Sequence, residues 1–186
     1  MKDRLGLAFF AFAAVISTLA AWEEPSILAW LAALHNTILA ILYAHRRPPR
    51  EYDRFGLLLG LLAAVLPLAA PYPEHIPPVS LVAGLFGYIL VLWSLLALGS
   101  RFGIAPADRG LVVHGPYRLV RHPMYLGELI LRLALASTAP QPYLAVALFC
   151  ILVAIQAVRA LREEHILSGY SAYAGSVRFR MIPGIW

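Results

Sequence analysis

The sequence contains few cysteines and few charged residues, and both shortages limit what the protein can be. Cys150 is its single cysteine, so the chain can form neither an internal disulfide nor a cysteine-based metal site. Charged residues make up 13% of the 186 residues and hydrophobic residues 61%, whereas soluble domains are typically about a quarter charged. A short chain with this composition is expected to be an integral membrane protein rather than a soluble domain.

The sequence also lacks the patterns of nucleic-acid-binding proteins and of metalloenzymes. Its formal net charge is +5, but the arginines do not form a continuous basic face, so we expect no nucleic-acid partner. Its six histidines are spread along the chain without a paired HxxxH motif, so we expect no metal site.

Apolar runs predict helical membrane segments, since a spanning helix needs about 20 mostly apolar residues. The runs are Leu5–Trp22, Ile27–Ala44, Phe55–Ala70, Val79–Ser100, Tyr125–Ala139 and Tyr143–Val158. The third and the last are short, and Tyr125–Ala139 is marginal because it carries Glu128 and Arg132. The predicted fold is therefore all-α: a polytopic helical bundle of five to six membrane segments, with a C-terminal hairpin and a cytosolic tail helix.

The basic residues predict the orientation of these segments. If six segments cross the membrane from a cytoplasmic N-terminus, every lysine and arginine outside a span lies on the cytoplasmic side. The opposite connections, near Glu23, at 71–78 and around Gln141, contain no lysine or arginine. This is the positive-inside pattern, so we expect both termini and residues 101–124 in the cytoplasm.

Residues 115–125, GPYRLVRHPMY, gather polar side chains between two apolar runs. Gly115, followed by proline, is expected to open a turn. His122 stands before a proline that favours the first position of a helix. Arg118 and Arg121 would precede this helix, and with its free N–H groups they could hold a carboxylate or a phosphate. Alternatively, these side chains only anchor a helix at the membrane surface.

A second polar segment, residues 158–173, has helical spacing and is predicted to leave the membrane or lie along its surface. Adjacent residues on a helix project about 100° apart. Glu163 and Glu164 would therefore not face one site equally, and the alternative to a functional role is a solvated face. The segment nevertheless lies on the same predicted side as the basic turn, so the two could hold a zwitterion between them.

The motif GPYRLVRHPMYLG, the apolar hairpin after it, the REEHIL segment and the terminal RMIPG resemble the isoprenylcysteine carboxyl methyltransferase and phospholipid methyltransferase superfamily. These are integral membrane enzymes that use S-adenosylmethionine. The resemblance covers roughly residues 98–184. It divides the chain into N-terminal transmembrane helices at 1–78 and a methyltransferase-like half at 79–186. The tail departs from the pattern, because GYSAY stands at 169–173 where the family often has a glycine-rich segment.

The resemblance implies a site for S-adenosylmethionine formed by the turn and the tail. The cofactor-binding residues that it implies are Gly103, Tyr117, Arg121, His122, Tyr125, Glu163 and Glu164. We also expect catalytic roles for Arg121, Glu164 and Glu128. The expected acceptor is a lipophilic molecule from the bilayer, such as a prenylcysteine carboxylate or a phospholipid amine. A carboxylate would need no general base, whereas an amine or hydroxyl could give its proton to Glu128, Glu164 or His122.

Two polar pairs lie inside the predicted spans. Glu128 and Arg132 stand four residues apart, which favours a pair along one helix. Because ionisable groups in a span usually face an interior cavity, they either line the route of the acceptor or form a structural ion pair. His35 and Asn36 are expected to form a hydrogen-bonded contact between helices.

Other functions are compatible with this pattern. The membrane half also resembles that of NADPH-dependent sterol-type reductases, but the compact motif with an acidic pair favours a methyltransferase. A small transporter or a non-enzymatic subunit would spread its polar residues through the spans, whereas here they cluster on one side. The sequence leaves open the methyl acceptor, the oligomeric state, and whether the protein lies in the cell inner membrane or an endomembrane.

Overall fold

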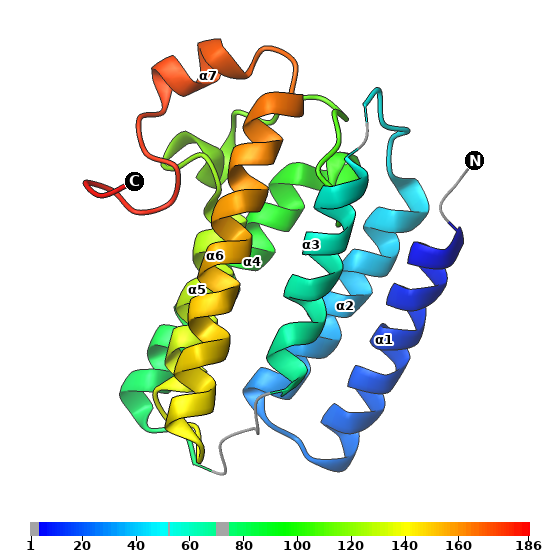
Figure 1. The fold of residues 1–186 in the computed structure, drawn as a ribbon. Helices are drawn as coiled ribbons and strands as arrows, with labels where there is room; N and C mark the ends of the chain where they lie inside the picture. The colour runs from blue at the N-terminus through cyan, green and yellow to red at the C-terminus, as the bar shows by residue number, and fades with distance from the viewer. Residues whose placement is uncertain (1–3, 52, 70–74) are drawn as a thin grey trace. The chain divides into compact units, whose positions relative to one another are not determined.

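The computed structural model describes residues 4–51, 53–69 and 75–186, and within these ranges the chain is helical and contains no β-strand (Figure 1). The α-helices are α1 (Arg4–Glu23), α2 (Ile27–His45), α3 (Arg54–Val65), α4 (Pro78–Leu98), α5 (Pro123–Ala136), α6 (Pro142–Ile166) and α7 (Tyr170–Ser176). Short 3-10 helices are η1 (Leu66–Ala69), η2 (Gly99–Arg101) and η3 (Gly115–Arg118).

Four helices among the described residues, α1, α2, α4 and α6, are long and apolar enough to cross a membrane. α3 and α5 are shorter, at 12 and 14 residues, and they correspond to two of the runs that the sequence marks as short or marginal. The all-α membrane fold is therefore confirmed. The last run was predicted too short, because α6 extends through 25 residues.

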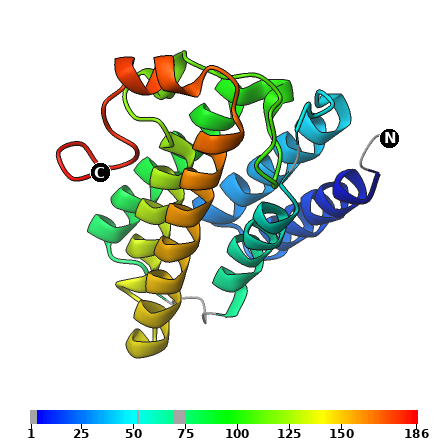
Figure 2. The same ribbon diagram turned by 45° about the horizontal axis from the view of Figure 1, so that its top comes forward.

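The chain forms two compact units. The first comprises Met1–Pro48 and Leu98–Gly103. In it α1 and α2 lie side by side (Figure 2), and Asn36 Nδ2 donates a hydrogen bond to Ser17 Oγ at 3.2 Å. This confirms the predicted helix–helix hydrogen bond of Asn36. Such bonds recur between membrane helices because a polar side chain has few other partners there.

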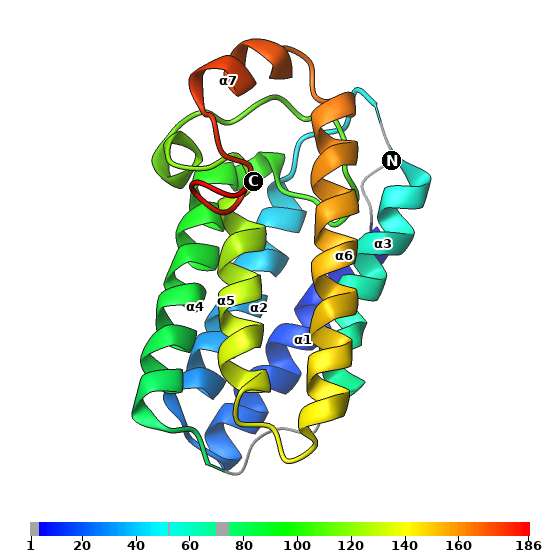
Figure 3. The ribbon, with the colours of Figure 1, turned by 60° about the vertical axis from the view of Figure 1, so that its left-hand side comes forward.

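The second unit comprises Pro49–Ala97 and Ile104–Trp186. Figure 3 shows α5 between α4 and α6 in this unit. α4 and α5 touch through their backbones: a β-carbon added at Gly87 would lie 2.6 Å from the Gly127 carbonyl oxygen, and one at Gly127 would lie 2.7 Å from the Gly87 oxygen. Small residues commonly allow such close packing of membrane helices.

The tail differs from its predicted helix over 158–173. α6 continues unbroken to Ile166, because no glycine or proline interrupts it between Pro142 and Gly169. Gly169 then adopts a positive φ of 78°, which favours glycine, and α7 begins at the next residue. The predicted single helix is therefore divided, and both glutamates belong to the last turns of α6.

We predict that Gly87→Ala destabilises the protein by about 1–3 kcal/mol, because the new methyl group would collide with backbone atoms that cannot rotate away. Thermal unfolding of the detergent-solubilised protein measures the effect. Gly84→Ala on the same helix is the matched control, since its β-carbon would meet only ordinary contacts of 3.5 Å or more. Equal stability of the two variants would contradict the close packing.

Candidate functional site

The turn and the tail are joined through their backbones. Gly115 opens η3 with a φ of 61°, and α5 begins at Pro123 with His122 as its N-cap, so the predicted turn and helix start are both confirmed. The Arg121 amide donates to the Phe179 carbonyl oxygen at 2.9 Å, and the His122 amide donates to the Arg180 carbonyl oxygen at 2.7 Å. These two bonds fix the start of α5 against the tail segment that follows α7.

The imidazole of His122 lies between the two adjacent glutamates of α6. Its Nδ1 is 3.5 Å from Glu163 Oε2, and its Nε2 is 3.5 Å from Glu164 Oε1. The alternative of a solvated face does not apply to the glutamates, since their side chains are only 24% and 11% exposed. The physical reason is that the two ring nitrogens point in different directions, so one imidazole meets two side chains that diverge on the helix.

Glu164 is surrounded by donors. Arg180 binds it through two nitrogens, with Nε at 2.8 Å from Oε1 and NH2 at 3.0 Å from Oε2. Arg121 NH1 donates to Oε1 at 3.2 Å, and the Tyr170 hydroxyl donates to it at 3.1 Å. The carboxylate therefore links the turn, α6 and the tail in one network of charge-assisted hydrogen bonds.

Buried tyrosines complete the network. Tyr125 donates from its hydroxyl to Glu163, and its ring stacks on His122 with centroids 5.6 Å apart and an interplanar angle of 5°. Tyr117 is buried, and its carbonyl oxygen accepts a 2.6 Å hydrogen bond from the Tyr173 hydroxyl. The tyrosines thus hold the motif turn against both α6 and α7.

The side chains of the cluster stabilise one another's charged forms. Burial alone would lower the pKa of His122, but its hydrogen bonds to Glu163 and Glu164 raise that pKa above its ordinary value of 6.5. The hydrogen bond to Glu164 likewise raises the pKa of the Arg180 guanidinium. The two carboxylates therefore favour the charged form of His122, which lies beside the guanidinium groups of Arg121 and Arg180.

Two predicted site residues lie apart from this cluster. Gly103 belongs to the first compact unit, whereas the residues of the cluster belong to the second. Glu128 accepts a hydrogen bond from Gln156, and within the described ranges no ion pair joins it to Arg132. Arg159 joins this group, with NH1 2.9 Å from Gln156 Oε1.

The structure adds four residues that were not among the predicted site residues: Tyr170, Arg180, Gln156 and Arg159. The first two lie in the tail, where the spacing of the tyrosines and the RMIPG segment were the available signals. Gln156 and Arg159 are polar residues at the end of an apolar run, and polar groups in a span are a general sign of function. The roles of all these residues stay predictions.

A family model for phospholipid methyltransferases matches residues 78–172, just over half of the chain. The chain belongs to the phospholipid methyltransferase family. The match extends from α4 into α7, so it includes the motif turn and both glutamates, whereas Arg180 lies beyond it. No curated protein matches the chain. The family and the apolar helices together identify an integral membrane protein of a methyltransferase family, as the sequence predicted.

The pairing of His122 predicts a dependence of stability on pH. A group whose pKa is raised by folding contributes full stability below its unfolded-state value, here 6.5, and loses it as the pH rises through the folded-state value. We therefore expect the apparent melting temperature to fall as the pH is raised above 6.5, and His122→Gln to flatten this part of the profile. His165→Gln, at an exposed histidine of α6, is the control. An unchanged profile in His122→Gln would contradict the ion pairing.

Proposed function

We propose that the protein is an S-adenosylmethionine-dependent methyltransferase that acts on a lipophilic acceptor. Membership of the phospholipid methyltransferase family supports methyl transfer. The observation that carries the proposal is the buried cluster in which His122 lies between Glu163 and Glu164, with Arg121 and Arg180 beside them. A cluster of positively and negatively charged side chains at the end of a candidate spanning helix suits a charged cofactor and an acceptor from the bilayer.

The donor groups fit S-adenosylmethionine, which presents a carboxylate, an ammonium, a ribose and a sulfonium. Arg121 and the N-terminus of α5 would hold the carboxylate. Arg121 Nε is buried and has no hydrogen-bond partner in the part of the chain that the structure describes, so a donor is available for this purpose. Glu163 and Glu164 would hold the cationic or ribose end, and the stacked rings of His122 and Tyr125 would form an adjacent wall.

The cofactor supplies a methyl group that is already activated on a sulfonium, so the protein contributes mainly proximity and orientation. The backbone bonds between turn and tail fix the position of these side chains, and the burial of His122 and Tyr125 excludes water. During transfer a bond forms between the acceptor and the methyl carbon, while the electron pair of the broken carbon–sulfur bond remains on sulfur.

An amine or hydroxyl acceptor would also lose a proton. His122 is a weak candidate for the base, because its two carboxylate partners favour its charged form. Glu164 is already engaged by arginines. Glu128 accepts a single hydrogen bond, from Gln156, within the described residues. If a base is needed, we propose Glu128, which lies on α5 in the hydrophobic part of the chain. A carboxylate acceptor would need none.

Binding of S-adenosylhomocysteine to the purified protein tests the proposal. We expect Glu164→Gln and His122→Ala each to weaken binding roughly ten- to a hundredfold, since losing one side of a charge-assisted contact typically costs about 1.5–3 kcal/mol. Arg178→Ala is the control, because this side chain is exposed in the same tail segment. Calorimetry measures all four proteins. Binding of NADPH in place of S-adenosylhomocysteine would favour a reductase instead.

We also propose that the termini and the site face the cytoplasm, on the basis of the arginine distribution. In a Cys150→Ser background, a cysteine in place of exposed His75 should react with an impermeant thiol reagent added outside intact cells. A cysteine in place of exposed Arg118 should react only after the membrane is opened. The reverse pattern would show that the orientation is wrong.

A further inference from the structure

We propose that Arg132 and Arg159 form a subsite for an anionic group of the acceptor, a carboxylate or a phosphodiester, between α5 and α6. The inference rests on the proposed function only in taking the bound molecule to be the methyl acceptor. It concerns residues outside the cofactor cluster, and it narrows the acceptor from any lipophilic molecule to one that carries a negative charge.

Arg159 is a buried cation with an unused donor. It is 5% exposed, although it lies in a candidate spanning helix. Its NH1 donates to Gln156 Oε1 and its NH2 to the Ile104 carbonyl oxygen, both at 2.9 Å. Its Nε is buried without a hydrogen-bond partner among the described residues. Both partners are neutral oxygens, so neither of them compensates the charge of the guanidinium.

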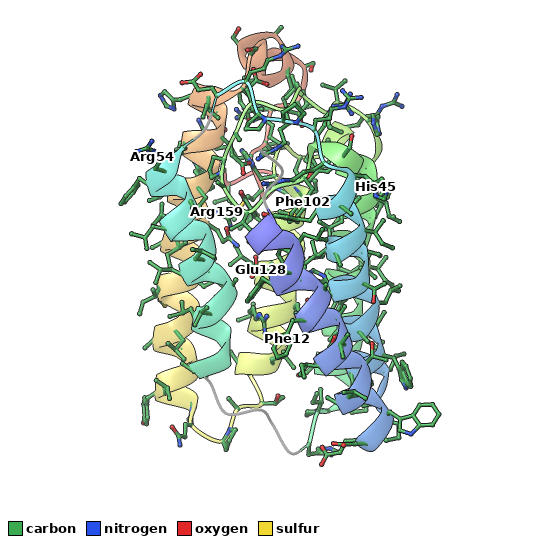
Figure 4. The ribbon with its side chains drawn as sticks, turned by 90° about the vertical axis from the view of Figure 1, so that its right-hand side faces the viewer. Phe12, His45, Arg54, Phe102, Glu128 and Arg159 are labelled. Atoms are coloured by element: carbon green, nitrogen blue, oxygen red, sulfur yellow. The ribbon has the colours of Figure 1, made fainter. Side chains whose placement is uncertain are left out.

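Gln156 separates this arginine from the nearest carboxylate. The side chain is fully buried. Its amide nitrogen donates to Glu128, while its amide oxygen accepts from Arg159. In Figure 4, Arg159 lies nearer the α7 end of the unit than Glu128 does. Because Gln156 is interposed, Glu128 and Arg159 are members of one hydrogen-bonded chain but are not a direct ion pair.

Arg132 adds a second cation to the same region. It lies one turn beyond Glu128 on α5, and both Arg132 and Arg159 are close enough to Glu128 to act on it electrostatically. The Arg132 Nε is also buried, and the described residues offer it no hydrogen bond. Arg159 also acts on Glu163, but that carboxylate is already paired with His122, so the positive charges outnumber the carboxylates here. An excess cation with unpaired donors is costly in a hydrophobic environment and usually has a functional partner.

An anionic group on the acceptor would supply the hydrogen-bond acceptor and the negative charge that Arg132 and Arg159 lack. Carboxylates and phosphodiesters accept hydrogen bonds from guanidinium groups with good geometry. The subsite also lies one side chain away from the cofactor cluster, because the Tyr125 ring is 4.7 Å from the Arg159 guanidinium and its hydroxyl donates to Glu163. An acceptor anchored by its anion between the arginines would thus have its other groups within reach of the cluster.

Four probes test the proposal on the full-length protein in an uncharged maltoside detergent, with native mass spectrometry as the measurement. They are oleate, oleoyl lysophosphatidylglycerol, monooleoylglycerol and inorganic phosphate. We expect the two anionic amphiphiles to bind at least about tenfold more tightly than monooleoylglycerol, a difference that corresponds to one charge-assisted contact. Inorganic phosphate should not displace them. Displacement by inorganic phosphate would indicate a site for a free anion and would overturn the assignment to the acceptor.

Arg132→Gln should abolish most of the preference for the anionic amphiphiles and leave monooleoylglycerol binding unchanged. Arg54→Gln, at an exposed arginine of the same compact unit, should retain the preference. Arg159→Lys provides a second, charge-conserving variant and should retain part of it. A preference that is absent in the wild type, or equal in Arg132→Gln, would overturn the subsite.

Stability separates this role from a structural one. If Arg132 were a structural partner of Glu128, Arg132→Gln would lower the apparent melting temperature, whereas removal of an uncompensated cation should leave it unchanged or raise it. Binding of S-adenosylhomocysteine by Arg132→Gln should equal that of the wild type. If the wild type binds S-adenosylhomocysteine but shows no anion preference, the subsite is wrong and the proposed function stands. If the wild type does not bind S-adenosylhomocysteine, the proposed function itself fails.

Discussion

The contact of one histidine with two adjacent glutamates is the interaction on which the rest of the site depends. Neighbouring residues of a helix diverge, so they can serve one site only if a third group spans the angle between them. His122 does this because its ring carries a nitrogen toward each carboxylate. Its position is fixed by the helix that begins at Pro123 and by its backbone bond to Arg180. The motif turn, α6 and the tail are thereby brought to one point.

Burying charged and polar side chains in a hydrophobic environment costs free energy. This cost explains why the polar residues form a continuous chain of contacts. Hydrogen bonds link Glu128 to Gln156 and Gln156 to Arg159, and Arg159 then lies over the ring of Tyr125. The Tyr125 hydroxyl continues the chain to Glu163. Each side chain in the series provides an interaction partner for the next, which lowers the free-energy cost of burying them. The continuous helix α6 carries three members of this chain, so their spacing follows directly from its periodicity.

Local features were predictable from the sequence, and features that depend on distant contacts were not. The apolar runs and the proline after His122 located the helices and the start of α5, because both signals act within a few residues. The glutamates were assigned to the cofactor site only through the family resemblance, since nothing in their own segment reveals that His122 meets both. Arg180 was not assigned to the site because its bond to Glu164 spans 16 residues and depends on the turn at Gly169.

The pairing of the charges also determines what a ligand must do in order to bind. Both oxygens of Glu164 already accept hydrogen bonds from arginine. A cationic group that binds this carboxylate must therefore replace an arginine. Its affinity then reflects only the difference between its own hydrogen bonds to Glu164 and those that the arginine made. The buried Nε of Arg121 is different, because it has no partner among the described residues and gains a bond outright. Affinity for a zwitterion should thus come more from its carboxylate than from its ammonium, while the glutamates fix its orientation.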